Sequence, residues 1–394
     1  MSVAAGQQPF RGPPPLSLYV HIPWCVQKCP YCDFNSHALS TMHAAIPEAD
    51  YIAALIADLE TALPLVWGRR IESLFFGGGT PSLLSGEGLD RLLAALRSLL
   101  PISPTAEITL EANPGTVDAA RFAEFHAAGV NRLSLGIQSF NAGHLRALGR
   151  IHDDRQAREA IEIAARHFEN FNLDLMYGLP GQTPADALAD IDIARTFAPP
   201  HLSCYQLTIE ANTAFAARPP PLPAPDSCAD MQDALEERLA DAGYRHYETS
   251  AFAQPGRQCL HNLNYWHFGD YLGIGAGAHG KLTLHDRVLR QMRWKHPERY
   301  LIKVAAGTPL QDEFAVTAAD LPFEFMMNAL RLRQGFDVAL FEQRTALPLL
   351  CIEDELRQAE NDGLIERPTG RIVPSDRGRR FLNRLLERFL VDRD

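Results

Sequence analysis

Short apolar segments alternate with longer amphipathic segments along the chain from residue 18 onward. Apolar runs bounded by turn residues predict buried strands, and apolar residues spaced three and four apart predict helices. Six strands are predicted, at residues 17–22, 71–76, 107–111, 132–137, 172–176 and 201–208. Five helices lie between them, at residues 51–63, 88–100, 117–128, 154–167 and 184–197, with Ser85 and Thr116 as N-cap residues of the second and third. This alternation predicts βα units around a parallel sheet, an α/β fold.

Six βα units are too few to close an eight-stranded barrel, so the pattern predicts an open, partial (β/α)6 barrel. The proline-rich run at residues 218–225 indicates a linker or a stiff loop at the end of that barrel. We therefore divide the chain into a flexible N-terminus (1–16), the partial barrel (17–217), a connecting α/β segment (218–316) and a C-terminal α+β domain (317–394). The order helix, helix, short hairpin, helix in the last domain resembles a winged helix.

Composition narrows the class of protein. The 394-residue chain has a formal net charge of −11, which argues against a nucleic-acid partner. Its first residues lack the apolar core of a signal peptide, and no stretch reaches the roughly 18 apolar residues of a membrane helix. The seven cysteines are an odd number without the spacing of a disulfide framework, which fits a reducing compartment. We expect a cytoplasmic protein without a transmembrane segment.

Three cysteines form the most specific motif. Cys25, Cys29 and Cys32 have the spacing C-x3-C-x2-C directly after the first predicted strand. Thiolates are soft ligands that suit iron–sulfur clusters and zinc, and three of them leave one coordination position open. A zinc site completed by a distant histidine or cysteine is the alternative. Zinc ligands usually come as two short pairs, whereas the remaining cysteines are isolated, namely Cys204, Cys228, Cys259 and Cys351.

Polar and glycine residues follow the predicted strands where each strand ends. Residues 77–81 (Gly-Gly-Gly-Thr-Pro) follow the second strand, Glu111 ends the third, Gln138 follows the fourth and Asp174 lies in the fifth. In a parallel barrel these ends open on one face, so we expect one common site. Arg150 can bind a ligand carboxylate through two of its guanidinium nitrogens.

The cysteine spacing after this strand resembles that of the radical S-adenosylmethionine (SAM) superfamily. The resemblance implies a [4Fe–4S] cluster held by Cys25, Cys29 and Cys32, with SAM on the fourth iron. It further implies that Gly78, Gly79 and Thr80 receive the amino group of SAM.

Within that superfamily, residues 18–23, 133–140 and 174–180 are similar to the coproporphyrinogen III dehydrogenase family. The similarity implies that Tyr19 packs near the cluster and that four further residues contact SAM, namely Glu111, Gln138, Arg150 and Asp174.

Two departures point to another branch of this family. The dehydrogenase has a further cysteine one residue past the third, where this chain has Cys32-Asp33-Phe34. It also has a longer N-terminal arm, whereas 17 residues precede Leu18 here. Both features match the haem-chaperone branch, which implies haem as cargo and apo-haem proteins, respiratory ones among them, as acceptors. Phe34 is then placed to shield the cluster from solvent.

A histidine-containing motif points the same way. Residues 261–266 match the H-N-x-x-Y-W signature of the haem-chaperone branch. An exposed His261 beside Tyr265 and Trp266 can ligate haem iron while the aromatic rings cover the macrocycle. The alternative is that these residues only pack a strand edge or a loop. Three other residues compete for the iron, namely Cys259, His267 and His279.

The prediction for function is thus a haem chaperone with a SAM-liganded cluster. An oxygen-independent coproporphyrinogen III dehydrogenase stays open as an alternative, because the SAM contacts are retained whether or not SAM is turned over. An RNA-modifying radical SAM enzyme is the second alternative and depends on the winged-helix-like tail. A homodimer and peripheral membrane contact are further expectations from the resemblance.

Overall fold

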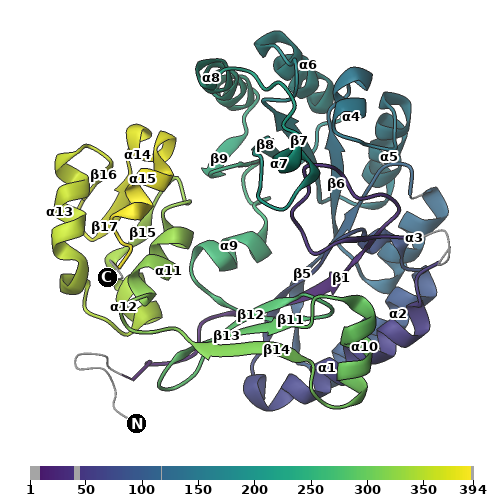
Figure 1. Cartoon of the computed structure of the whole chain (residues 1–394), viewed down its shortest axis with the longest axis horizontal. Coiled ribbons are helices and arrows are strands. Elements are labelled where there is room, and N and C mark those ends of the chain that lie inside the picture. The colour runs from purple at the N-terminus through teal and green to yellow at the C-terminus, as the bar shows by residue number, and fades with distance from the viewer. Residues whose placement is uncertain (1–8, 40–44, 117, 392–394) are drawn as a thin grey trace.

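A twelve-stranded sheet dominates the computed structural model, which describes residues 9–39, 45–116 and 118–391. The strand order is β14-β13-β12-β11-β1-β4-β5-β6-β7-β8-β10-β9. The six central neighbours from β1 to β8 run parallel, as predicted. They are β1 (Leu16–Ile22), β4 (Ile71–Gly78), β5 (Ile102–Ala112), β6 (Arg132–Gln138), β7 (Phe171–Tyr177) and β8 (His201–Gln206). This part of the molecule is an open barrel (Figure 1).

Helices follow these strands and cover the outside of the barrel (Figure 1). They are α1 (Glu48–Val66), α2 (Gly86–Leu99), α3 (Ala119–Ala128), α5 (Asp154–His167) and α6 (Pro184–Arg195), with the short α4 (Ala142–Ala147), α7 (Ala214–Ala217) and the 3-10 helix η1 (Pro81–Leu83). Every predicted strand and helix of the barrel is present, with small differences at the ends.

One of the two predicted N-caps is wrong. Ser85 does cap α2, because its hydroxyl accepts a hydrogen bond from the backbone N–H of Gly88. Thr116 does not cap α3, because its hydroxyl donates to the carbonyl of Asn113 at 2.7 Å, and Asp118 is the N-cap instead. Residue 117, the predicted start of this helix, lies outside the described residues.

The two faces of a barrel strand have different surroundings. In β1, Leu18, Val20 and Ile22 are fully buried in the main hydrophobic core, while Tyr19 lines a cavity inside the barrel. Because successive side chains of a strand point to opposite faces, the apolar set fixes the strand to the helices and leaves the alternate set for a ligand. Each fully buried leucine or isoleucine contributes about 1.5 to 3 kcal/mol to this packing.

The connecting segment extends both edges of the same sheet. On one edge, β9 (Arg245–Glu248) and β10 (Ala251–Ala253) follow α8 (Pro225–Asp241), which packs on α6. On the other edge, β11 (Asp270–Ile274) pairs in parallel with β1 and continues into β12 (His279–Thr283), β13 (Val288–Arg293) and β14 (Leu310–Ala315). Helix α9 (Leu260–Trp266) joins the two halves, and α10 (Pro297–Ala305) lies between β13 and β14. The domain boundaries stay predictions. The sheet runs across the boundary predicted between residues 217 and 218.

The C-terminal region has its own hydrophobic core and the predicted winged-helix-like order. Its elements are α11 (Leu321–Ala329), β15 (Phe336–Asp337), α12 (Val338–Thr345), η2 (Leu349–Ile352), α13 (Glu353–Asn361), β16 (Ile365–Glu366), β17 (Arg371–Pro374), α14 (Asp376–Arg380) and α15 (Leu382–Glu387). The three strands form a small sheet in the order β15-β17-β16. Phe325 packs edge to face on Phe336 and Phe341 in the centre of this core.

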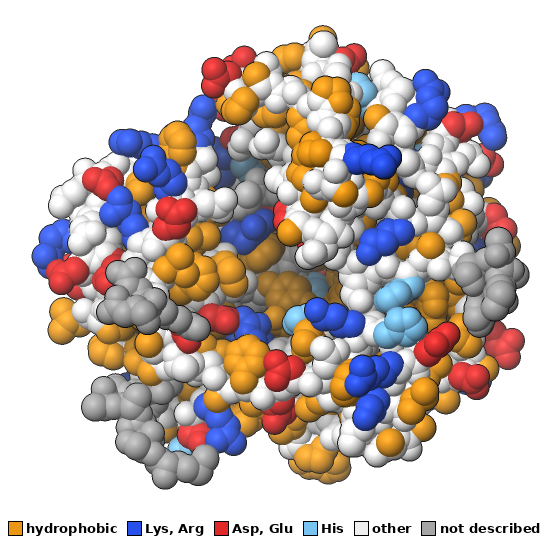
Figure 2. Space-filling view, in the orientation of Figure 1, with side chains coloured by type: hydrophobic (Ala, Val, Ile, Leu, Met, Phe, Trp, Pro, Cys, Tyr) orange, Lys and Arg blue, Asp and Glu red, His pale blue; other side chains and the backbone are white. Residues whose placement is uncertain are grey.

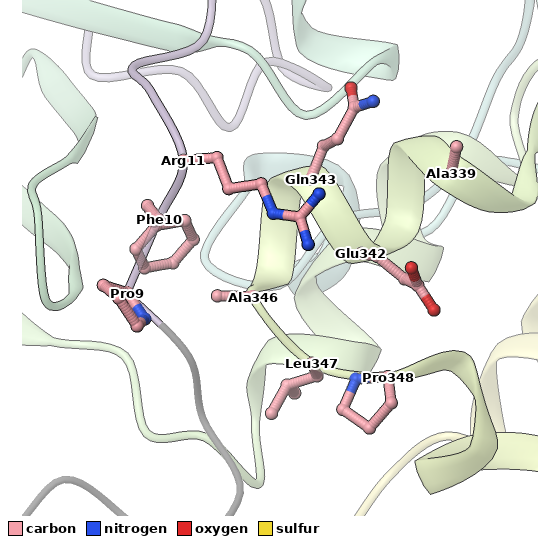
Figure 3. Close-up of a pocket in the computed structure, with 9 residues that line it drawn as sticks. All are labelled: Pro9, Phe10, Arg11, Ala339, Glu342, Gln343, Ala346, Leu347 and Pro348. Carbon is pink, nitrogen blue, oxygen red and sulfur yellow. The ribbon is translucent and has the colours of Figure 1, made fainter.

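The described part of the N-terminus lies against the C-terminal region. Phe10 is only 7% exposed, belongs to the C-terminal core, and donates its backbone N–H to the carbonyl of His285. Pro9, Phe10 and Arg11 line one side of a cavity of about 220 Å³, opposite Glu342 and Gln343 of α12 (Figure 3). No helix among the described residues is long and apolar enough to cross a bilayer.

Candidate functional site

A cavity of about 380 Å³ lies at the carboxyl ends of the parallel strands. It brings together ten of the twelve residues that the sequence predicts for the site, namely Cys25, Cys29, Cys32, Gly78, Gly79, Thr80, Glu111, Gln138, Arg150 and Asp174. Tyr19 and His261 lie elsewhere, in an adjoining cavity. The convergence follows from topology, because every βα connection of a parallel barrel opens on the same face.

The cysteines lie on a loop that a short ladder closes. Strand β2 (Trp24–Cys25) pairs in parallel with β3 (His37–Ala38), so the loop between them leaves and rejoins the barrel at one place. Lys28 fastens it further, since its ammonium donates to the carbonyls of Phe34 and Ser36. The three thiols are half-buried and face the cavity.

The donor set fits an iron–sulfur cluster. In a [4Fe–4S] cluster each cysteine binds a different iron, so the thiolates need not converge on one point. Indeed, no three His, Cys, Asp or Glu side chains among the described residues converge as ligands of a single ion. Hydrogen bonds to the sulfurs are already present, because Arg150 Nη1 donates to Cys29 Sγ at 3.7 Å and Ser36 Oγ lies 3.8 Å from Cys32 Sγ. Such bonds tune the potential of a cluster.

Burial removes solvent from the Cys25 and Cys32 thiols and thereby raises their pKa values. Cluster ligation requires thiolates, so a bound cluster must supply the positive charge that stabilises them.

The glycine turn after β4 brings two strands unusually close. The backbone N–H of Gly79 donates to the carbonyl of Ile22 at 2.7 Å, and a Cβ on Gly79 would lie 2.5 Å from the backbone oxygen of Trp24. Gly78 has a φ of +113°, which only glycine adopts without strain. The turn therefore has to be glycine for structural reasons before any ligand is considered, and it sets Thr80 at the cavity wall.

Four acidic residues line the cavity, and two of them, Glu111 and Asp174, hydrogen-bond to its walls. Glu111 Oε2 accepts the backbone N–H of Gly78, and Asp174 accepts hydrogen bonds from Ser134 and Asn172. Burial, followed by the proximity of Asp174, raises the pKa of Glu111 to about 8, and burial also raises the pKa of Asp174. At neutral pH the carboxyl group of Glu111 is therefore mostly protonated. A cationic group in the cavity would favour the charged form and be bound by it.

Arg150 is held by the chain itself in this conformation. Its Nη2 donates to Asn113 Oδ1 at 2.5 Å and to the carbonyl of Gly136 at 2.7 Å. Gln138 lies beside it with a left-handed φ of +68°, an uncommon conformation for a residue other than glycine. The roles of both residues as SAM contacts stay predictions, and a ligand carboxylate would have to approach the remaining face of the guanidinium.

The adjoining cavity of about 200 Å³ lies deeper in the barrel. It shares Glu111, Ser134, Asp174 and Tyr205 with the first cavity, so these side chains separate the two. Tyr19 lines only the deeper one, where its hydroxyl lies 2.9 Å from His21 Nδ1 and its ring stacks on Phe75.

His261 lies at the closed end of this deeper cavity and is not exposed, contrary to the expectation from the sequence. Its side chain is 1% exposed, its Nδ1 lies 3.1 Å from Ser73 Oγ, and its Nε2 lies 3.1 Å from the hydroxyl of Tyr265. Burial lowers its pKa to about 3. Both ring nitrogens thus have partners, and the ring stacks on Phe75. In this conformation His261 closes the barrel rather than presenting a ligand for iron.

The competing candidates differ in their surroundings. Cys259 is as buried as His261 and its thiol contacts Glu107, whereas His267 and His279 are both exposed.

Sequence reasoning missed several residues of the main cavity. Asn113 bridges Thr80 and Arg150 through its amide, and Met176 and Tyr205 line the wall. Asn113 and Met176 lie at or just past the ends of predicted strands, so the same signal that identified Glu111 was available for them. Tyr205 lies within the strand predicted at residues 201–208 and carries no such signal.

Comparison with known proteins agrees with this geometry. Residues 19–194 match the Radical SAM superfamily, and residues 316–381 match the HemN C-terminal domain. The heme chaperone HemW of Escherichia coli (strain K12) is 49% identical over 381 residues, which cover 96% of this chain and 99% of that protein. The heme chaperone HemW of Mycobacterium tuberculosis (strain ATCC 25618 / H37Rv) is 37% identical over 95% of this chain and 94% of that protein.

Among solved structures, the coproporphyrinogen III oxidase HemN of Escherichia coli, a radical SAM enzyme, superposes with a TM-score of 0.80. It is 26% identical, and the alignment covers 96% of this chain and 90% of that one. The extent and identity of these similarities show that the chain belongs to the radical SAM superfamily and, within it, to the family of the heme chaperone HemW.

Proposed function

We propose that this protein is a haem chaperone, which binds haem and passes it to apo-haem proteins, and that a SAM-liganded [4Fe–4S] cluster lies at its main cavity. The single observation that carries this proposal is the 49% identity to a heme chaperone over 96% of the chain. The cavity supports it independently, because three thiols, four carboxyl groups and a guanidinium line one space of about 380 Å³.

The residues that would hold the cofactors follow from this arrangement. Cys25, Cys29 and Cys32 would bind the cluster through their thiolates. SAM would then lie between the cysteine loop and the wall formed by Glu111 and Asp174, whose carboxyl groups suit its ammonium and its ribose hydroxyls. When bound and reduced, such a cluster supplies the electron that cleaves SAM. The chain's own residues would bind and orient the cofactor.

A second candidate function has a specific observation in its favour. The superposition on coproporphyrinogen III oxidase covers 96% of the chain, and most of the residues predicted for SAM line the cavity. Against it, Asp33 and Phe34 follow Cys32 where the dehydrogenase has a cysteine, and Phe34 is 60% exposed at the mouth of the cavity. The exposed ring leaves the cavity open rather than shielded, so the expectation that it covers the cluster is not met in this conformation.

An RNA-modifying function finds no support in the C-terminal arginines. Five of them lie in ion pairs with aspartate or glutamate, namely Arg367, Arg371, Arg379, Arg380 and Arg388. Their charge is thus largely used within the chain and not presented as a phosphate-binding surface. Respiratory acceptors, a homodimer, a cytoplasmic location and peripheral membrane contact stay proposals by analogy to the family.

The experiment that separates the dehydrogenase from the chaperone uses one preparation. The protein is reconstituted anaerobically with iron and sulfide, then given either haem or coproporphyrinogen III with SAM and a reductant. We expect a saturable shift of the haem Soret band and no protoporphyrinogen. Sustained protoporphyrinogen formation, or a Soret band identical to that of free haem at every protein concentration, would refute the chaperone function.

A further inference from the structure

Two histidines meet at the surface beside the cysteine loop. His37 lies in β3, which closes that loop, and His296 is the N-cap residue of α10. Their ring centroids are 5.4 Å apart with the planes at 70°, an edge-to-face contact. Histidine side chains also stand among Lys and Arg side chains on the face of the molecule above α10 in Figure 2. Neither histidine has a place in the SAM site.

The inner ring is neutral and held in place. His37 hydrogen-bonds the backbone carbonyl of Lys295, and among the described residues no group hydrogen-bonds its Nε2, although that atom is buried. Burial, and then the neighbouring His296, lower the pKa of His37. A buried nitrogen without a partner is unusual, because satisfied polar atoms are the rule in folded proteins.

The ring of His296 is exposed to solvent and can be reached by a ligand. His296 stands at the start of α10 but makes no side-chain capping hydrogen bond, so the imidazole is not needed to begin the helix. An imidazole fixed on one side by an edge-to-face neighbour is restricted in orientation, which lowers the entropy lost on binding a metal. Imidazole is also the commonest protein ligand of haem iron.

Basic residues lie near the pair in space or along the chain, although the whole chain carries a net charge of −11. Lys28 interacts electrostatically with His37, and Lys295 precedes His296 directly. On α10, the guanidinium of Arg299 lies 3.9 Å and the ammonium of Lys303 lies 5.2 Å from the ring centroid of Trp294. Glu298 is the acidic residue on the first turn of α10.

These charges decide which ligand the pair suits. Nearby cations disfavour a bare divalent ion, and among the described residues no third His, Cys, Asp or Glu completes an ion site. They favour instead a ligand with a metal centre and peripheral carboxylates. A haem presents iron to an imidazole and two propionates to lysine and arginine.

We propose that the haem cargo binds on this surface, with His296 as the axial ligand of the iron. This inference rests on the proposed chaperone function and names its cargo site. His37 orients the His296 ring, and Lys28, Lys295 and Arg299 bind the propionates. The axial ligand is thus assigned to His296 instead of the buried His261, because a porphyrin reaches His296 without opening the barrel.

The position of the pair also connects the cargo to the cluster. Asn35 of the cysteine loop donates hydrogen bonds to the carbonyls of Ala276 and Lys295, both at 2.9 Å. The cysteine loop and the segment that carries His296 are therefore fixed to each other.

The test is a haem titration of the full-length, cluster-reconstituted protein, followed by Soret absorbance and by electron paramagnetic resonance of ferric haem. We expect His296→Ala to bind haem at least tenfold more weakly and to lose the imidazole-type spectrum, and added free imidazole to restore that spectrum. His126→Ala is the matched control, because His126 is also exposed and also contacts an aromatic ring, Phe168, edge to face at 5.4 Å. It should behave as wild type.

The outcomes separate the two proposals. Wild-type affinity and spectrum in His296→Ala would overturn the cargo site while leaving the chaperone function standing, since the wild type binds haem. An equal loss in His126→Ala would overturn it too, because the effect would then not be specific to the pair. If the wild type itself binds no haem, the proposed function fails and the cargo site fails with it.

Discussion

Glu111→Gln tests the electrostatics of the main cavity without changing its volume. The pKa of Glu111 is raised from 4.5 to about 8, first by burial and then by Asp174. In the unfolded chain the group has its ordinary value, so between these two pH values the folded state holds a proton that the unfolded state has lost. The free energy of unfolding of the wild type therefore falls as the pH rises through this window. Glutamine does not titrate and lacks that loss.

The magnitude follows from the size of the shift. One pKa unit corresponds to about 1.4 kcal/mol, so the wild type would lose about 3 kcal/mol between pH 4.5 and pH 7 from this group alone. Water in the cavity that Glu111 lines screens part of the effect. We therefore expect Glu111→Gln to be about 2 kcal/mol more stable than the wild type at pH 7, and equally stable at pH 4.5.

The assay is equilibrium urea unfolding of the chain without cluster, followed by circular dichroism at several pH values from 4.5 to 8. Glu162→Gln, on the exposed face of α5, is the matched control and should follow the wild type. Parallel pH profiles for the wild type and Glu111→Gln would refute the reasoning, because they would mean that the carboxyl group is charged in the folded protein at neutral pH.

Further predictions concern the cluster, the glycine turn and the buried histidine. The reconstituted wild type should contain about four irons per chain and Cys29→Ala should lose the cluster; unchanged iron in the variant would disprove the ligand assignment. Gly79→Ala places a Cβ 2.5 Å from the Trp24 carbonyl oxygen and should lower the thermal midpoint, whereas Gly12→Ala, where a Cβ meets nothing within 4 Å, should not; equal midpoints would contradict the close approach. His261→Phe removes the hydrogen bonds of His261 to Ser73 and Tyr265 and should cost about 2 kcal/mol of stability in urea unfolding. The same variant should keep the imidazole-type haem spectrum, and its loss in a folded variant would return His261 to the iron.

The parallel strands of the barrel were predictable from the sequence for a physical reason. Most residues of strands such as β1 and β4 are buried and apolar residues predominate in them, whereas the apolar residues of their helices repeat at a different period. The site was predictable for a related reason, because polar residues such as Glu111 and Asp174 stand out where such a strand ends. The pairing of β11 with β1, across some 250 residues, leaves no local signal and was not predicted.

Side-chain environment was harder to predict than position. The H-N-x-x-Y-W motif indicates chemistry, but whether His261 faces solvent depends on Ser73, which lies 188 residues away in the chain. Likewise the choice between Thr116 and Asp118 as N-cap depends on where the loop after β5 turns back, and Thr116 is occupied by the carbonyl of Asn113. The contact of His37 with His296 is again a long-range one, and neither residue stands out in its own segment.

The central claim is that this protein binds haem and transfers it to an apo-haem protein. The most direct measurement mixes the haem-loaded, cluster-reconstituted protein with an apo-haem protein and follows the Soret band of each at matched concentration against free haem. We predict that the Soret band of the acceptor grows as that of the haem-loaded protein disappears. An excess of a non-haem protein should leave the haem-loaded protein unchanged. A donor that keeps its haem in the presence of excess acceptor, or transfer no different from that of free haem, would contradict it.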